Sequence, residues 1–423
     1  MSGTAILAVV VITYALFAAV LDRRSITAPI LFVAAGVALG PDGLDVVSFG
    51  FNDEVTLRIT ESVLALLLFA DAATVPLAAV ESDPGIPGRL LGIGLPLTIA
   101  LGTLVAWLLF PDPGWAAAAL VATILAPTDA ALGTAVVTNP AVPVRIRRAL
   151  NVESGLNDGI ATPFVTLFLA IVVAEEEHAG GAWVAEAAAE IGIALLVAAA
   201  VGFIGGRLVR AARQRGWSSR TSEQLAVLAL AIVAYAGAVA LGGNGFVAAF
   251  VGGIIFGAVA GRAVHDAVGY AETTSTFASF FVWTVFGVLF VGPLLTRGLD
   301  VATVAFAVLS LTVVRMLPVA IALRGTGLRG TTLAFMGWFG PRGLASVVFT
   351  LIAVEAIGEA GGFGTELADV ATATIALSVL LHGLSAGPLA TRYASWLQGD
   401  AASAEMLDVP EPRRRRHIAD PVS

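Results

Sequence analysis

The polar stretch Glu153-Ser154-Gly155-Leu156-Asn157-Asp158 decides how the whole chain is interpreted. It interrupts Arg145–Ala174, a segment that is otherwise apolar and long enough to cross a lipid bilayer. A carboxylate near the middle of a membrane costs about 2.5–3.5 kcal/mol on insertion scales. Two acids in one such segment, Glu153 and Asp158, therefore indicate an ion pathway in which the carboxylates are the binding groups.

The composition predicts an all-α polytopic membrane protein. Of 423 residues, 58% are hydrophobic and 13% are charged, whereas a soluble domain carries about 25% charged residues. The chain has no cysteine, which excludes disulfides and thiolate metal sites, and its 23 basic residues are all arginine. We expect neither an enzyme, nor a bound cofactor, nor a nucleic-acid partner. Residues 1–397 are expected to form one transmembrane domain.

Apolar runs between charged or Gly/Pro-rich breaks predict thirteen transmembrane spans. The predicted spans are Ala5–Leu21, Thr27–Leu39, Val55–Val80, Arg89–Phe110, Trp115–Thr138, Arg145–Ala174, Ala182–Ala211, Thr221–Leu241, Gly245–Gly261, Glu272–Val291, Val301–Leu323, Thr331–Ile357 and Thr365–Ala390.

The distribution of arginine predicts the orientation in the membrane. With the N-terminus outside, most arginines fall on the cytoplasmic side, and the outer loops are acidic instead. This pattern requires an odd number of spans and a cytoplasmic C-terminus. We expect the protein to lie in the cell membrane. The tail, residues 398–423, is polar and contains the run Arg413–Arg416, and we expect it to be disordered.

Thirteen spans suggest two six-helix repeats of inverted topology around a linking helix. On that pairing the fifth and twelfth spans correspond, and each has a proline-centred polar break, at Ala126–Asp129 and at Gly340–Gly343. Broken helices in corresponding positions indicate a binding site near the membrane midplane. The alternative is that Gly and Pro are simply common in membrane helices.

The sixth span presents its polar groups on one side. Ser154 and Asp158 are one helical turn apart, and Glu153 and Asn157 form a second such pair. Carboxylate, hydroxyl and amide oxygens are hard ligands that suit hard cations such as Na⁺. A structural hydrogen-bond patch between helices would explain the serine and the asparagine but leaves the two acids unexplained.

The fifth span adds Thr128 and Asp129 beside Pro127. Proline has no amide hydrogen, so it frees a carbonyl about one turn earlier in the helix. Exposed backbone oxygens inside a membrane must line a cavity or bind something. The alternative is a plain proline kink in which Asp129 pairs with an arginine.

Two arginines lie within predicted spans, Arg315 in the eleventh and Arg342 in the twelfth. A buried arginine needs a partner because it cannot lose its charge. We favour Glu153 as the partner of Arg342, which leaves Asp158 free to titrate, and the sequence names no partner for Arg315. His382 has no second histidine at ligand spacing, so a metal site there is not expected.

These motifs resemble the monovalent cation/proton antiporter 1 family, which includes the electroneutral Na⁺/H⁺ exchangers. The stretch from Glu153 to Gly159, followed by Thr162-Pro163, is similar to the family signature. Pro127-Thr128-Asp129-Ala130 resembles its unwound helix, and Phe339-Gly340-Pro341-Arg342-Gly343 resembles its arginine-bearing helix. The similarity covers nearly the whole chain.

The resemblance implies a thirteen-helix antiporter fold that works as a homodimer in the lipid bilayer. It implies that Asp158 binds a proton and a sodium ion in turn, and that Asn157 marks electroneutral exchange of one Na⁺ (or Li⁺ or K⁺) for one H⁺. The Na⁺ ligands that it implies are Asp158, Asp129, Ser154 and the Thr128 carbonyl, with Glu153 acting directly or through water and Arg342 in support.

Two other classes of transport protein remain open at the level of sequence. A cation channel could use the acids as a selectivity ring, and its flux would need no proton coupling. A symporter for an organic anion could use a similar inverted-repeat fold, but acids outnumber arginines at the centre of this chain. The ligand types are shared by Na⁺, K⁺ and Li⁺, so the sequence does not choose among these ions.

Overall fold

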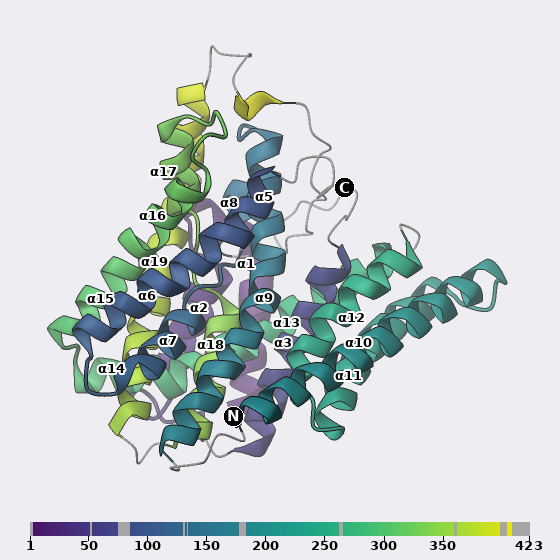
Figure 1. Ribbon diagram of the computed structural model, residues 1–423, viewed down its shortest axis with the longest axis horizontal. Helices are drawn as coiled ribbons and strands as arrows, with labels where there is room; N and C mark the ends of the chain where they lie inside the picture. The colour runs from purple at the N-terminus through teal and green to yellow at the C-terminus, as the bar shows by residue number, and fades with distance from the viewer. Residues whose placement is uncertain are drawn as a thin grey trace. The chain divides into compact units, whose positions relative to one another are not determined.

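The computed structural model describes residues 3–50, 53–74, 85–129, 132, 134–176, 183–261, 265–358, 362–397 and 404–407, and these residues are helical apart from turns and connections (Figure 1). The helices are α1 (Gly3–Arg23), α2 (Ala28–Leu39), α3 (Glu54–Thr74), α5 (Gly85–Arg89), η1 (Leu90–Gly94), α6 (Leu95–Leu109), α7 (Gly114–Ile124), α8 (Thr134–Val137), α9 (Val144–Glu176), α10 (Trp183–Gln214), α11 (Arg220–Ala240), α12 (Gly245–Ala260), α13 (His265–Phe286), η3 (Gly287–Val291), α14 (Gly292–Arg297), α15 (Val301–Leu311), α16 (Val313–Ala322), α17 (Gly330–Trp338), α18 (Leu344–Ile357), α19 (Gly362–Leu397) and η4 (Ala404–Met406).

The chain divides into two compact units. Unit 1 comprises residues 1–57, 82–154 and 280–423, and unit 2 comprises residues 58–81 and 155–279. The boundary at residue 154 falls within α9, so the first part of this helix belongs to unit 1 and the rest to unit 2.

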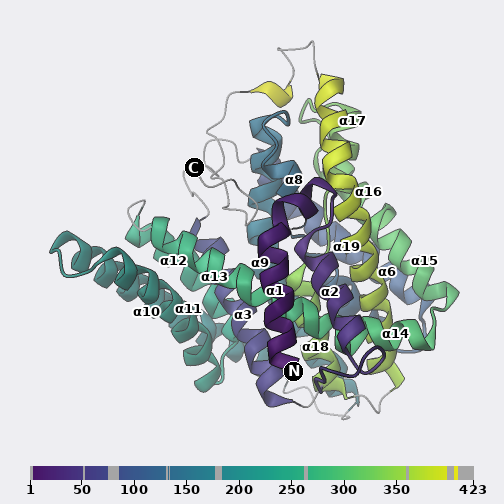
Figure 2. The ribbon, with the colours of Figure 1, turned by 180° about the vertical axis from the view of Figure 1, so that it is seen from behind.

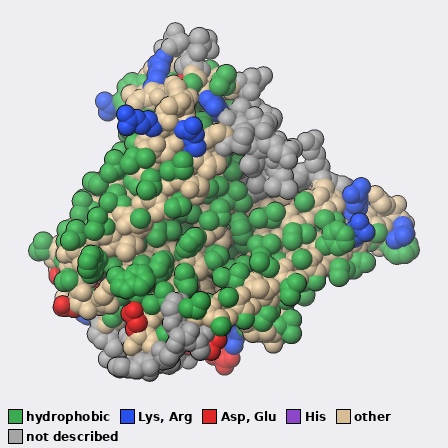
Figure 3. Space-filling view, viewed as in Figure 1, with side chains coloured by type: hydrophobic (Ala, Val, Ile, Leu, Met, Phe, Trp, Pro, Cys, Tyr) green, Lys and Arg blue, Asp and Glu red, His purple; other side chains and the backbone are tan. Residues whose placement is uncertain are grey.

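The helices confirm an all-α polytopic membrane protein. Within the described residues, eight helices are long and apolar enough to cross a membrane. Four shorter apolar helices accompany them, namely α2, α7, α12 and α18. Hydrophobic side chains dominate the face shown in Figure 3, whereas most of its basic side chains lie toward the upper edge and its acidic side chains toward the lower edge. The count of thirteen spans and the inverted repeats stay predictions.

Both predicted helix breaks are present. α7 ends at Ile124 and α8 begins at Thr134, and five residues separate the end of α17 at Trp338 from the start of α18 at Leu344. A third interruption was not predicted: the span expected over Val301–Leu323 is divided at Thr312, where the backbone has φ −111° and ψ −90°. The residues after each interruption are therefore turned away from the path of a continuous helix.

Small residues allow close helix packing in unit 2, where α10, α11 and α12 lie side by side (Figures 1 and 2). A Cβ atom placed on Gly253 or Gly257 of α12 would lie 2.4 Å from the carbonyl oxygen of Phe69 or Ala73 in α3. These glycines thus permit backbone contact between α12 and α3. Phe69 and Phe256 pack in the core beside them, with ring centroids 5.5 Å apart.

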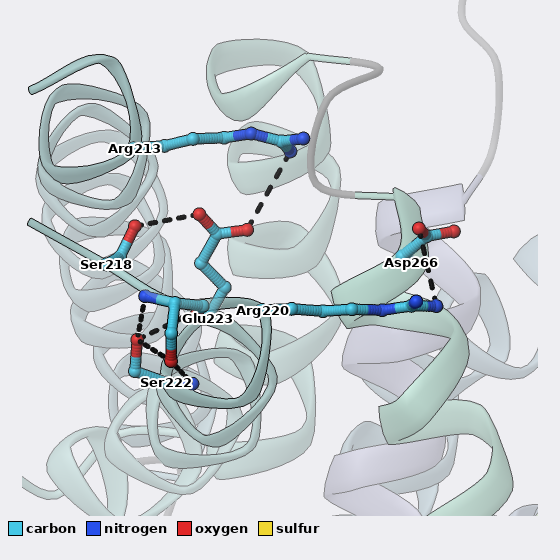
Figure 4. Close-up of polar contacts among 7 residues, drawn as sticks. Arg213, Ser218, Arg220, Ser222, Glu223 and Asp266 are labelled. Atoms are coloured by element: carbon cyan, nitrogen blue, oxygen red, sulfur yellow. Dashed lines mark hydrogen bonds and ion pairs between the residues drawn. The ribbon is translucent and has the colours of Figure 1, made fainter. Parts of the chain in front are cut away.

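Polar contacts tie together the ends of α10, α11 and α13 in unit 2 (Figure 4). Ser219 caps α11 by accepting a hydrogen bond from the Ser222 amide (3.2 Å), and the Ser222 hydroxyl accepts one from the Ser219 amide. Glu223, which is buried, accepts from the Ser218 hydroxyl (2.8 Å) and lies 3.7 Å from Arg213. Arg220 of α11 lies 3.5 Å from Asp266 of α13.

Part of the tail folds back onto unit 1. Glu405 of η4 is buried and accepts hydrogen bonds from the Arg329 amide (2.9 Å) and the Thr332 hydroxyl (2.7 Å) at the start of α17. The carbonyl of Ala404 accepts one from Arg145 at the start of α9 (2.6 Å). Residues 404–407 therefore differ from the disordered tail expected, and the rest of residues 398–423, including the arginine run, lies outside the described residues.

Candidate functional site: two crossing broken helices

The two helix breaks of unit 1 meet each other. The Asp129 amide donates a hydrogen bond to the Pro341 carbonyl (2.8 Å), and the Leu344 amide lies 3.4 Å from Asp129 Oδ2. One turn away, the Ser346 hydroxyl donates to the carbonyl of Ile124, the last residue of α7 (2.7 Å). Backbone groups that each break removes from its own helix are thus satisfied by the other broken helix.

Glycine makes this close crossing possible. A Cβ atom on Gly343 would lie 2.0 Å from the Cβ of Asp129, and one on Gly340 would lie 2.4 Å from Nε of Arg315. Real Cβ atoms do not approach other atoms this closely, so a larger residue at Gly343 would push the two breaks apart and one at Gly340 would displace Arg315.

The Arg342 side chain donates hydrogen bonds to backbone carbonyls of the first helix break. Its side chain is fully buried, and Nη1 donates to the carbonyls of Ala126 (2.9 Å) and Pro127 (3.4 Å). Nη2 donates to the Ser310 carbonyl near the end of α15 (3.2 Å). The guanidinium therefore brings a positive charge to an unwound stretch whose carbonyl dipoles have lost their helical partners.

Glu153 pairs with the other buried arginine. Its Oε1 lies 2.6 Å from Nη1 of Arg315, and each side chain is only 3% exposed. The expected pairing of Glu153 with Arg342 is wrong, because Arg342 forms no ion pair in the part of the chain that the structure describes. The interruption at Thr312 starts a new helix, α16, and this helix carries Arg315 to Glu153.

Ser154 joins α9 to the first break. Its hydroxyl donates to the Thr128 carbonyl at 2.7 Å, and both residues are buried. A small cavity of about 20 Å³ lies beside this contact. It is lined by Thr128, Asp129, Val136, Val137, Leu150, Ser154, Phe339 and Pro341. The space is sufficient for one water molecule or one small cation beside a carboxylate, a hydroxyl and a backbone carbonyl.

Asn157 and Asp158 lie on the next turn of α9. Both are buried, and the Asp158 carbonyl accepts a hydrogen bond from the Thr162 hydroxyl (2.8 Å). The helix is unbroken from Val144 to Glu176, so the one-turn spacing of Ser154 and Asp158 that the sequence predicted is present.

Unit 1 therefore brings together five of the predicted site residues: Thr128, Asp129, Glu153, Ser154 and Arg342. Sequence reasoning missed two contributors, Ser346 and the Arg315 partner of Glu153. Ser346 follows the second break by one turn, and a small hydroxyl residue at such a position is the signal that could have revealed it.

Buried acids and arginines where two broken helices meet are typical of ion-binding sites inside polytopic transport proteins. The chain belongs to the sodium/hydrogen exchanger family, whose transmembrane region matches residues 7–392.

Relatives of this chain include both sodium and potassium antiporters. The Na⁺/H⁺ antiporter of Saccharomyces cerevisiae is 30% identical over 145 residues, which are 33% of this chain and 15% of the yeast protein. The K⁺/H⁺ antiporter NhaP2 of Shewanella oneidensis is 24% identical over 373 residues, 86% of this chain and 62% of that protein. The chain thus spans less than two thirds of the length of either relative.

The fold is similar to that of a solved antiporter. The sodium proton antiporter MjNhaP1 from Methanocaldococcus jannaschii, at pH 8, superposes with a TM-score of 0.74. The match covers 93% of this chain and 98% of the other at 17% identity, so it shows a shared fold. The chain therefore has the architecture of this antiporter.

Proposed function

We propose that this protein exchanges one Na⁺ for one H⁺ across the cell membrane without net charge movement. The observation that supports this most strongly is the anchoring of Asp129, whose backbone amide and carboxylate both contact the second broken helix. Burying an acidic side chain inside a membrane protein costs free energy, so an acid that is fixed in this way indicates ion binding. K⁺ is a further candidate cargo ion, since K⁺/H⁺ antiporters are among the relatives, and Li⁺ is another because the same ligand types suit it.

The proposed Na⁺ ligands are carboxylate, hydroxyl and backbone oxygens. Asp158 is the group that binds the cation and the proton in turn, and Asp129, Ser154 and the Thr128 carbonyl complete the set. The Ser154 hydroxyl proton points to the Thr128 carbonyl, which leaves lone pairs of both oxygens available to a cation. Glu153 acts indirectly, because Arg315 already occupies one of its oxygens.

Exchange follows from competition for one carboxylate. A bound sodium ion stabilises the charged form of Asp158 and displaces its proton, and a proton neutralises the group and weakens sodium binding. If only a loaded site can cross the membrane, each turnover carries one cation one way and one proton the other. Asn157 stands next to Asp158 and cannot ionise, so we infer that no second proton is carried there.

The remaining architectural proposals follow from the sequence pattern. We infer thirteen spans in two inverted repeats, an N-terminus outside, a cytoplasmic C-terminus and a homodimer in the lipid bilayer. Opposite breaks in α7–α8 and α17–α18 are the arrangement that such repeats would produce. Movement of the ion-binding helices would then alternate access to the two sides.

The test is proton flux in proteoliposomes that contain a pH-sensitive dye. Addition of Na⁺ should release the dye from quenching in the wild type, and Asp158→Asn should abolish this response. Asp266→Asn is the matched control, because it also neutralises one aspartate, but its carboxylate is largely exposed and pairs with Arg220 at 3.5 Å. Each alkali cation is then tested in turn, which identifies the cargo. An Asp158→Asn variant with most of the wild-type rate would refute the assignment.

Charge balance is tested separately with an imposed membrane potential. Net movement of one charge is worth about 2.3 kcal/mol per 100 mV, so an electrogenic carrier would respond strongly. The one-for-one proposal predicts an exchange rate that does not change with the potential. Sodium flux that is independent of pH would favour a channel instead.

A further inference from the structure

His382 and Ser378 lie one turn apart on α19 and are both buried. Both side chains contact the backbone of the second helix break, which lies between α17 and α18, one near each end of the break. The Ser378 hydroxyl accepts a hydrogen bond from the Arg342 amide (2.8 Å), and His382 Nε2 lies 2.8 Å from the carbonyl of Trp338, the last residue of α17. The side chains of α19 thus bind backbone groups that flank the break.

Both ring nitrogens of His382 face hydrogen-bond acceptors. Nε2 lies 2.8 Å from the Trp338 carbonyl, and Nδ1 lies 2.9 Å from the Ser378 carbonyl and 3.0 Å from Ser378 Oγ. Ser378 Oγ also accepts a hydrogen bond from the Arg342 amide. A continuous chain of polar contacts therefore runs from the Arg342 amide through Ser378 and His382 to the Trp338 carbonyl.

The segment between Trp338 and Arg342 forms a hydrogen bond to Asp129. Pro341 lies inside it, and its carbonyl accepts the Asp129 amide at 2.8 Å. Leu344, two residues beyond Arg342, places its amide 3.4 Å from Asp129 Oδ2. A shift of the break would consequently move the carboxylate of Asp129. The break contains Gly340, Pro341 and Gly343, and glycine adds little stiffness to the backbone.

We propose that His382 and Ser378 are positioning residues for cation binding. They hold the second break in place and, through it, the Asp129 carboxylate, although neither touches the ion. This inference rests on the proposed function, in which Asp129 is a cation ligand. Groups that orient a ligand in this way typically change ion affinity by about 10–100-fold when they are removed.

The test compares four variants in the dye-based exchange assay. His382→Leu and Ser378→Ala each remove one link of the chain, and His382→Gln keeps an N–H donor near the Trp338 carbonyl. Thr374→Val is the matched control, because Thr374 is also buried on α19 but its hydroxyl bonds only its own helix, to Val370, among the described residues.

We expect the sodium concentration for half-maximal exchange to rise about tenfold in His382→Leu and Ser378→Ala. The maximal rate at saturating sodium should stay near that of the wild type. His382→Gln should recover most of the affinity, and Thr374→Val should match the wild type. A merely structural role predicts something different: a lower maximal rate and melting temperature, with no change in half-saturation and no rescue by glutamine.

A second measurement is independent of transport. Sodium should raise the melting temperature of the purified protein, and the concentration that gives half of this rise reports binding. The inference is overturned if His382→Leu and Ser378→Ala show wild-type half-saturation in both assays. Asp158→Asn separates this outcome from failure of the proposed function: exchange that survives Asp158→Asn would refute that function, whatever the α19 variants do.

Discussion

Glu153 on α9 and Arg315 on α16 form a buried ion pair, with 2.6 Å between Oε1 and Nη1. Each side chain is 3% exposed, and Glu153 is the one hydrogen-bond partner of the Arg315 side chain among the described residues. The pair joins a helix of the proposed ion site to a helix that follows an interruption at Thr312. It therefore fixes the first part of α9 within unit 1.

Removal of one partner should destabilise the protein strongly. Arg315→Leu leaves an uncompensated buried carboxylate and Glu153→Gln an uncompensated guanidinium, each at a cost of about 3–5 kcal/mol. The measurement is thermal unfolding of the detergent-solubilised protein. The double variant Glu153→Gln/Arg315→Leu should lose less stability than the sum of the two single changes.

The exposed pair Arg220–Asp266 provides the control for this cycle. Its atoms lie 3.5 Å apart and its side chains are 66% and 68% exposed. Arg220→Gln should change stability by less than about 1 kcal/mol, because water screens the pair. Equal effects of Arg220→Gln and Arg315→Leu would contradict a stabilising buried pair.

Gly343→Ala should disrupt the crossing of the broken helices. The new Cβ would lie 2.0 Å from the Asp129 Cβ, so the two breaks must separate. We expect loss of most Na⁺-dependent proton flux together with a lower melting temperature. Gly192→Ala on α10 is the control, because its Cβ would meet no atom within 4 Å and should stabilise the helix by about 0.5–1 kcal/mol. Wild-type flux in Gly343→Ala would contradict the close crossing.

The sequence predicted the helix breaks well because their causes are local. Pro127 and Pro341 each remove an amide hydrogen, and the polar residues beside them are costly in lipid. The spacing of Ser154 and Asp158 was likewise predictable, since it needs only the helical repeat.

Contacts between distant residues could not be predicted in this way. The sequence favoured Arg342 as the partner of Glu153, whereas the observed pairing with Arg315 depends on the interruption at Thr312. No proline or glycine lies within five residues of Thr312 to signal this interruption. The role of His382 was missed for a similar reason. Its partner Trp338 is 44 residues away, and no residue pattern links the two.

Asp300 should stabilise α15 in a pH-dependent manner. Its carboxylate accepts hydrogen bonds from the Thr303 hydroxyl (2.7 Å) and amide (2.8 Å), and these bonds hold the pKa of Asp300 below its usual value. A lowered pKa in the folded state adds stability at pH values above the ordinary aspartate pKa, and this stability disappears as the pH falls through the lowered value. Asp300→Ala should therefore cost about 1 kcal/mol near neutral pH and progressively less in acid.

Melting temperatures of the wild type and Asp300→Ala across this pH range provide the measurement. Asp300→Asn is the control, because asparagine also caps helices but does not titrate. The difference between Asp300→Asn and Asp300→Ala should stay constant with pH. A wild-type advantage over Asp300→Ala that persists undiminished at low pH would contradict this role of the ionised carboxylate.

Glu405 should stabilise the start of α17. Glu405→Ala removes the acceptor for the Arg329 amide and the Thr332 hydroxyl, both of which would be left without this bond. We expect a loss of about 1–3 kcal/mol in thermal unfolding. Glu355→Ala is the control, since Glu355 is exposed on α18. Equal melting temperatures of the two variants would indicate that the tail contact does not form in solution.

If one carboxylate holds either a proton or a cation, sodium binding to the purified protein must release a proton. Sodium is titrated into the purified protein in weakly buffered solution, and calorimetry in buffers of different ionisation enthalpy counts the protons released. We expect close to one proton per sodium ion in the wild type and neither binding nor release in Asp158→Asn. Sodium binding without proton release, or unchanged release in Asp158→Asn, would contradict it.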